Sequence, residues 1–241
     1  MQGIFGKETW TGRRNFYTII HNASQRKTIN FSVIICKLPY ECQELTAAIL
    51  GESVPTFLSA VDAALFRLIN GQGQNPFFDW FMPVMTDLKK FTFVLIVLGI
   101  WILWKKRKAG LIFLLFAGLT LTITDQLSSQ VLKEIIGRVR PCHVLENVHM
   151  LTDCNSSYSF PSSHAVNIFA AAWFLAQPLG RAAPVIFGVA AIVAYSRVYI
   201  GIHYPFDVAG GAAIGLLIAW PLRRLKDEVV ARFHLQNAKG K

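Results

Sequence analysis

Ionisable residues interrupt the apolar C-terminal half of the chain. The stretch from Ser196 to Asp207 contains Arg197 and His203 and lies between two strongly apolar runs. Ionisable side chains at the mouth of a membrane segment are costly, so they indicate a functional site. A carboxylate such as Asp207 fixes the tautomer of a neighbouring histidine and stabilises its imidazolium, which leaves the second ring nitrogen as a nucleophile. A purely structural contact between His203 and Asp207 is the alternative.

Two basic residues further upstream suit a phosphate group. Lys133 and Arg140 are seven residues apart, so a continuous helix would place them on one face. Arginine binds phosphate in a bidentate manner, whereas lysine acts as a point charge. The alternative is that Lys133, Arg138 and Arg140 are topogenic charges or bind lipid headgroups.

The segment Pro161-Ser162-Ser163-His164 stands immediately before an apolar run. Ser162 is a candidate N-cap of the helix that this run predicts. The free backbone N–H groups of a first helical turn form an anion site. A single histidine at a helix start is more often structural than catalytic, but the other two motifs favour a catalytic role for His164.

The three segments read Lys-x6-Arg-Pro, Pro-Ser-x-His and Ser-Arg-x5-His-x3-Asp. In this order and spacing they resemble the signature of the type 2 phosphatidic acid phosphatase (PAP2) family, which shares its site with the vanadium haloperoxidases. The resemblance covers roughly residues 54 to 222. It departs from the family pattern at Ser163, where glycine is usual; Ser163 still offers its N–H and adds a hydroxyl.

The resemblance implies a role for each matching residue. His203 would attack phosphorus in line and become a phosphohistidine, with Asp207 orienting its ring. His164 would protonate the leaving oxygen and then activate water. The remaining residues would hold the phosphoryl oxygens: Lys133, Arg140, Ser162, Ser163 and Arg197. The motifs supply no metal ligands, so neither a metal nor another cofactor is expected.

The composition favours a membrane protein. Of the 241 residues, 53% are hydrophobic and 16% are charged, and the formal net charge is +10. The basic residues are not gathered into one polar domain with interleaved aromatic residues, which argues against a nucleic-acid partner. The four cysteines include no Cys-x2-Cys pair, so zinc is not indicated. A disulfide between Cys142 and Cys154 and two free thiols are equally compatible with the sequence.

Apolar segments predict an all-α, polytopic membrane helical bundle of five to six transmembrane helices with a PAP2-like core. Before them, a helical stripe that begins at Val54 contains Asp62 and Arg67, which favours an interfacial helix over a span. The chain divides into a basic N-terminal extension (1–53), a membrane phosphatase domain (54–222) and a basic cytoplasmic tail (223–241). The five long apolar segments are 91–104, 109–131, 165–176, 183–199 and 208–222, and an alternative extends the first one backwards through Phe81 and Met85.

The basic loops predict the orientation. The positive-inside rule places 105–108 and 223–226 in the cytoplasm. Counting spans back from the tail adds Arg181 to that side and places all three motifs on the opposite side. Lys89 and Lys90 do not fit the positive-inside rule, because this arrangement places them outside or at the membrane interface. We therefore expect an integral membrane protein of a bacterial inner membrane, with its site facing the periplasm or the outside.

The expected function is metal-independent hydrolysis of a membrane lipid phosphate or pyrophosphate. Undecaprenyl pyrophosphate is the first candidate substrate, with phosphatidic acid, phosphatidylglycerol phosphate and lipid A 1-phosphate close behind, because the motifs bind phosphate and not the lipid. One alternative is a phosphotransferase that passes phosphate from the same intermediate to a lipid acceptor. Another is a non-enzymatic membrane protein with a relic site, although none of the key residues is lost. The sequence does not define the oligomeric state.

Overall fold

The computed structural model describes residues 56–239, and the regular elements in this range are helices. Residues 57–239 belong to one compact unit, which contains the three motifs. The predicted N-terminal extension (1–53) and the start of the helical stripe at Val54 lie outside the described residues.

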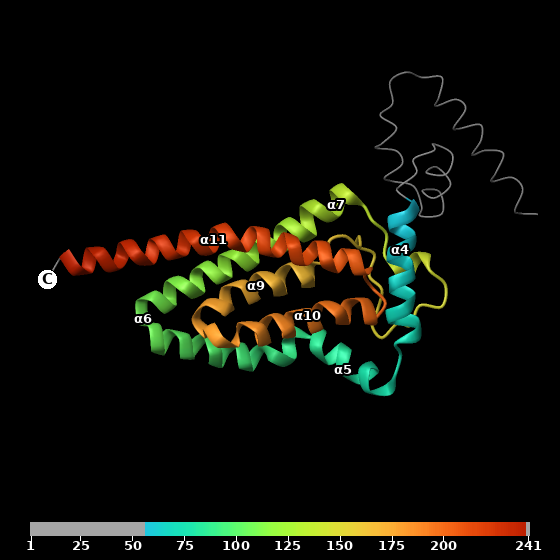
Figure 1. Cartoon of the computed structure of the whole chain (residues 1–241), viewed down its shortest axis with the longest axis horizontal. Coiled ribbons are helices and arrows are strands. Elements are labelled where there is room, and N and C mark those ends of the chain that lie inside the picture. The colour runs from blue at the N-terminus through green and yellow to red at the C-terminus, as the bar shows by residue number, and fades with distance from the viewer. Residues whose placement is uncertain (1–55, 240–241) are drawn as a thin grey trace, which may run out of the picture. The chain divides into compact units, whose positions relative to one another are not determined.

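Five helical legs build the membrane bundle (Figure 1). Helix α6 (Leu88–Gln126) supplies two of them, because its backbone turns at Arg107, where φ is 48° and ψ is −121°. Helix α9 (Ser163–Leu179) and α10 (Ala183–Tyr199) are separated by the short helix η3 (Gly180–Ala182). The last leg belongs to α11 (Pro205–Lys239), which continues without a break into the predicted tail.

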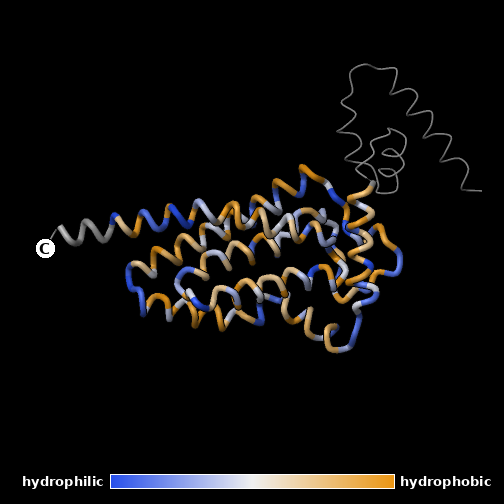
Figure 2. The backbone as a smooth tube through the Cα atoms, in the orientation of Figure 1, coloured by the Kyte–Doolittle hydropathy of each residue, from blue (hydrophilic) through white to orange (hydrophobic). Residues whose placement is uncertain are grey.

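The hydropathy of the legs explains this architecture. By length and composition, three segments of the described chain could cross a membrane: Lys89–Val144, Ser163–Tyr199 and Pro205–Arg232. Figure 2 shows hydrophobic residues along the legs and hydrophilic residues mainly near their ends. An exposed apolar helix surface is stable only against lipid. The predicted all-α membrane bundle is confirmed, and all five apolar segments fall on its legs.

Helices α9 and α11 approach each other closely near the N-terminus of each helix. A Cβ atom at Gly215 would lie 2.2 Å from the carbonyl oxygen of Val166, and one at Gly211 would lie 2.8 Å from that of Ser162. Small residues permit such close packing of helices in lipid. This contact fixes the spacing between the helices that carry His164 and Asp207.

The three motifs lie at one end of the bundle. The second leg of α6 continues through η2 (Leu127–Leu132) into α7 (Lys133–Ile136), and this end meets the start of α9, the end of α10 and the start of α11 (Figure 1). The turn at Arg107 and the α9–α10 connection with Arg181 lie at the opposite end. The separation of basic loops and motifs expected from charge is therefore present in the fold.

A short helix crosses the motif end of the bundle. Helix α4 (Thr56–Phe66) has 11 residues, fewer than a span requires, and runs across the long legs in Figure 1. Phe66 packs against Val198 and Tyr204. The helix η1 (Arg67–Gln72) then leads to α5 (Pro76–Thr86), which Asn75 caps by accepting a hydrogen bond from the N–H of Phe78. This arrangement supports the interfacial alternative for the first helix.

Candidate active site

The first motif does not form the continuous helix that its spacing suggested. Helix α7 ends at Gly137, which has a left-handed φ of 62° and donates its N–H to Lys133 O at 2.9 Å. Glycine commonly ends helices in this conformation. Pro141 then begins a separate helix, α8 (Pro141–Val144), with Arg140 at its N-cap position. The prediction that Lys133 and Arg140 share one helix face was therefore wrong.

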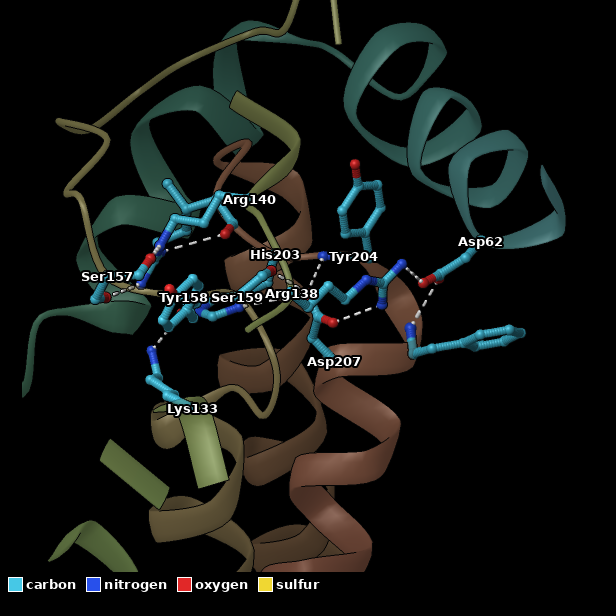
Figure 3. A network of polar contacts seen from close by, with 12 residues as sticks. Asp62, Lys133, Arg138, Arg140, Ser157, Tyr158, Ser159, His203, Tyr204 and Asp207 are labelled. Carbon is cyan, nitrogen blue, oxygen red and sulfur yellow. Dashed lines mark hydrogen bonds and ion pairs between the residues drawn. The ribbon is translucent and has the colours of Figure 1, made fainter. Parts of the chain in front are cut away.

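The two cations nevertheless meet at one loop (Figure 3). Lys133 Nζ donates to the carbonyl of Tyr158 at 2.8 Å, and Arg140 Nε donates to that of Ser157 at 2.7 Å. Arg140 also donates to the Ser157 hydroxyl at 2.8 Å and to Ile202 O at 3.2 Å. The loop before α9 therefore replaces the helix as the element that brings these two side chains together.

Both cations are buried without a carboxylate partner. Lys133 is 5% exposed and Arg140 is 4% exposed. Among residues 56–239, no carboxylate lies within ion-pair distance of either side chain or of Arg197. Buried charge without a counter-ion is costly. Three such cations at one end of a bundle suit a dianionic ligand.

Several buried polar atoms at this end also have no hydrogen-bond partner in the described part of the chain. They are Ser162 Oγ, Ser163 Oγ, Arg197 Nε and His203 Nδ1. Buried polar groups in native proteins are normally paired, so such a group needs an explanation. Three of the four can donate to a phosphoryl oxygen, and Arg197 is held in place by a hydrogen bond from Nη1 to the Thr86 hydroxyl.

The second motif opens α9 as expected, with one difference. Ser162 occupies the N-cap position, but its hydroxyl makes no capping hydrogen bond. Ser163 and His164 are the first two helical residues, and His164 is exposed. The first-turn N–H groups of a helix have no intrahelical acceptor and attract anions. Ser163 therefore has the same free first-turn N–H that glycine would have at this position.

The third motif places the predicted histidine and carboxylate side by side. His203 Nδ1 lies 3.6 Å from Asp207 Oδ2, which is beyond ordinary hydrogen-bond length. The carboxylate is already occupied: Oδ2 accepts from the Ser159 hydroxyl and from Tyr204 N at 2.8 Å, and Oδ1 accepts from Arg138 at 2.6 Å. Asp207 is 0% and His203 2% exposed.

The burial of His203 sets its protonation state. Loss of solvation lowers the pKa of its imidazole to about 3. The ring is therefore neutral at neutral pH and keeps the lone pair that a nucleophile needs.

We expect the protein to lose stability as the pH falls below about 6.5. The pKa of His203 is about 3 when folded, against an ordinary value of 6.5, so the unfolded chain binds more protons between these values. Stability is full above this window and declines as the pH falls through it. Thermal unfolding of the wild type from about pH 7 to pH 4 should show a steeper loss than that of His203→Gln. Parallel curves would contradict this assignment.

Two residues of the site were missed from the sequence. Arg138 joins two carboxylates, with Nη2 2.6 Å from Asp62 Oδ2 and Nη1 2.6 Å from Asp207 Oδ1 (Figure 3). Its guanidinium lies 4.1 Å from the ring centre of Tyr204. Asp62 is 0% exposed, and its Oδ1 accepts from the N–H of Phe206 at 2.9 Å. The only hint in the sequence was the carboxylate of Asp62 within the apolar stripe of α4. The sequence did not show that Arg138 pairs with it.

The loop that organises the site is closed by a disulfide. Cys142 in α8 is bonded to Cys154, 12 residues further along the chain. Three residues further on begins the segment 157–159, which contacts Arg140, Lys133 and Asp207. Of the two alternatives for these cysteines, the structure contains the disulfide.

This combination of an all-helical membrane bundle with histidines and buried cations at one end defines an integral membrane protein with a phosphate site. Residues 110–230 match the family model of the PAP2 superfamily. The chain belongs to this superfamily, as its three motifs predicted.

The similar proteins of this superfamily are lipid phosphatases. The lipid A 4'-phosphatase of Bacteroides thetaiotaomicron is 32% identical over 186 residues, which cover 73% of this chain and 81% of the relative. Phosphatidylglycerophosphatase B of Bacillus subtilis is 33% identical over 204 residues, or 78% of this chain and 92% of the relative. The undecaprenyl-diphosphatase BcrC of Bacillus subtilis is 29% identical over 167 residues, or 68% and 83%.

Two solved structures share the fold. The crystal structure of Aquifex aeolicus LpxE has a TM-score of 0.54 and 30% identity, covering 67% of this chain and 94% of that one. The first transmembrane PAP2 type phosphatidylglycerolphosphate phosphatase from Bacillus subtilis has a TM-score of 0.55 and 29% identity, covering 83% and 94%.

Proposed function

We propose that this protein hydrolyses the phosphate or pyrophosphate of a membrane lipid through a phosphohistidine at His203. The observation that carries the proposal is the position of a buried, neutral imidazole beside Asp207, at the bundle end that holds three cations without carboxylate partners. The relatives described above are named phosphatases or diphosphatases of lipids, which supports this reaction class.

The first step transfers the phosphoryl group to the enzyme. His203 Nδ1 faces Asp207, so Nε2 attacks phosphorus and forms the N–P bond while the bond from phosphorus to the lipid oxygen breaks. His164 gives its proton to that leaving oxygen. The Nδ1 proton stays between the ring and the carboxylate, which stabilises the positive imidazole of the intermediate.

The second step returns the enzyme to its starting state. His164, now neutral, takes a proton from water as the water oxygen attacks phosphorus. The N–P bond breaks, inorganic phosphate leaves, and the electron pair returns to His203. The step therefore needs one water molecule and no other reactant. Because His164 must be protonated in one step and neutral in the other, we expect a bell-shaped dependence of rate on pH.

The cations and donors stabilise the charge that develops on the phosphoryl oxygens. Arg140 and Arg197 provide guanidinium forks and Lys133 a point charge. The unpaired hydroxyls of Ser162 and Ser163 and the first-turn N–H groups of α9 complete the cradle. None of these groups requires a metal.

The charge distribution of the fold supports a location in a bacterial inner membrane with the site facing the periplasm. The basic residues 105–108, the helix η3 with Arg181, and residues 223–239 of α11 lie at the end opposite the site, and positive loops stay in the cytoplasm. A disulfide beside the site suits an oxidising compartment. We retain 1–53, 54–222 and 223–241 as the proposed N-terminal extension, phosphatase domain and cytoplasmic tail.

Phosphate release by the detergent-purified full chain tests this function. The substrates are undecaprenyl pyrophosphate, phosphatidic acid, phosphatidylglycerol phosphate and lipid A, each with a metal chelator present. We expect release from at least one lipid at a rate that the chelator does not change. Loss of phosphate from the donor lipid that depends on an added lipid acceptor, and that yields phosphorylated acceptor in place of inorganic phosphate, would identify the phosphotransferase alternative. No turnover of any lipid, with or without acceptor, would favour a relic site.

A further inference from the structure

A carboxylate lies in a membrane-spanning segment of the bundle, close to the end that carries the proposed phosphate site. Asp125 is near the end of α6 and is exposed on the surface of the helix. Asn167 of α9 donates from Nδ2 to Asp125 Oδ1 at 2.9 Å. The Asn167 amide is itself oriented by Thr124, whose hydroxyl donates to Asn167 Oδ1 at 2.8 Å. The carboxylate is therefore held in a fixed place between the two helices.

This place lies about one helical turn from the proposed catalytic residue His164, on the side of the membrane-spanning segment. Asn167 follows His164 by three residues in α9, so it lies about 4.5 Å further along the helix axis into the membrane. Asp125 is close enough to interact electrostatically with both Lys133 and His164. A substrate whose phosphate lies between Lys133 and His164 would bring the group next to that phosphate close to Asp125.

The chemistry of this carboxylate restricts that group. An ionisable residue at membrane depth is costly and marks a functional position. Within residues 56–239, only Oδ1 of Asp125 receives a hydrogen bond, which leaves Oδ2 available. An ionised carboxylate accepts hydrogen bonds and donates none. It also repels a second phosphate and gains nothing from a hydrocarbon chain.

We infer that Asp125 and Asn167 form a subsite that binds a hydroxyl or amide N–H on the lipid scaffold beside the scissile phosphate. This inference rests on the proposed phosphatase function and names its substrate class: phosphomonoesters of a polyol or an acylated amino sugar. Phosphatidylglycerol phosphate has a hydroxyl on the carbon next to its phosphate ester, and lipid A has hydroxyls and amide N–H groups. Phosphatidic acid and undecaprenyl pyrophosphate have no such donor on their lipid scaffold. The subsite therefore reverses the substrate order expected from the motifs.

Substrate selectivity of an Asp125→Leu variant, which removes both the charge and the hydrogen-bond acceptor at similar side-chain volume, tests this subsite. We expect kcat/KM for phosphatidylglycerol phosphate and lipid A to fall by about 10- to 100-fold, which is the effect of losing a hydrogen bond to a charged group. The value for phosphatidic acid should change by less than about 2-fold, because that lipid makes no such bond. Asp153→Asn removes an exposed carboxylate from the loop before α9 and serves as the charge-matched control.

The outcomes separate the subsite from the function on which it rests. Equal losses for all lipids would show that Asp125 acts through His164 or Lys133, and this would overturn the subsite. A wild-type preference for phosphatidic acid or undecaprenyl pyrophosphate would also overturn it while leaving the phosphatase intact. Absence of phosphate release from every lipid by the wild type would instead remove the proposed function itself.

Discussion

Replacing His203 with alanine is expected to lower kcat for lipid phosphate release by about 10⁴- to 10⁶-fold, the cost of removing a covalent nucleophile. No other described imidazole lies beside Asp207, and the proposed mechanism assigns His164 the separate role of acid and base. The measurement is phosphate release by purified protein under saturating lipid. His203 is 2% exposed, so alanine leaves a cavity that destabilises the fold. A second variant, His203→Gln, retains most of the side-chain volume and separates loss of the nucleophile from loss of folding.

The control for this experiment is His143→Ala, which removes an exposed histidine from α8. It should retain wild-type kcat within a small factor. Both His203 variants should be inactive at temperatures where thermal unfolding shows that they remain folded. Residual turnover in folded His203→Gln above about one hundredth of the wild-type rate would be too high for loss of the nucleophile.

Replacing Arg138 with methionine is expected to have the largest effect on stability. Its guanidinium pairs with Asp62 and Asp207, which are both 0% exposed. Removing one member of a buried ion pair leaves uncompensated charge and costs about 3–5 kcal/mol of unfolding free energy. The catalytic rate should also fall, because Asp207 loses the donor on Oδ1 that holds it beside His203. Denaturant unfolding and phosphate release measure the two effects.

A double-mutant cycle isolates this interaction. Asp62→Asn keeps an oxygen acceptor for the N–H of Phe206 but removes the charge that pairs with Arg138. The losses from Asp62→Asn and Arg138→Met should therefore not add, with a coupling of about 1 kcal/mol or more. Arg181→Met at the opposite end of the bundle is the control and should stay within about 0.5 kcal/mol of wild type. Additive losses would contradict a role for Arg138 as the link between α4 and α11.

Local sequence patterns were sufficient to predict the helical bundle and the positions of most candidate site residues in it. The apolar segments defined the legs because lipid-facing helices must be apolar along their length. The motifs placed His164 at the start of α9 and His203 just before α11, because Ser162 and Pro205 mark helix starts. The charge of the short loops also assigned the motifs to one end of the bundle.

Tertiary contacts explain what the sequence could not provide. Asp62 and Arg138 are 76 residues apart, and their contact depends on how α4 crosses the bundle end. The spacing of Lys133 and Arg140 suggested a shared helix face, but Gly137 ends that helix and the loop at Ser157 joins the two cations instead. Ser162 is at the N-cap position with its hydroxyl unpaired, which a capping preference alone does not predict.

Detection of the phosphoenzyme tests the central claim most directly. Purified protein is mixed with a lipid substrate labelled in its terminal phosphate, quenched within the first turnover under alkaline conditions, and digested for peptide mass spectrometry. The phosphohistidine mechanism predicts label on the peptide that contains His203, formed before free phosphate appears and absent from His203→Gln. Phosphate release in a first turnover that leaves no label on His203, or label on another residue, would contradict it.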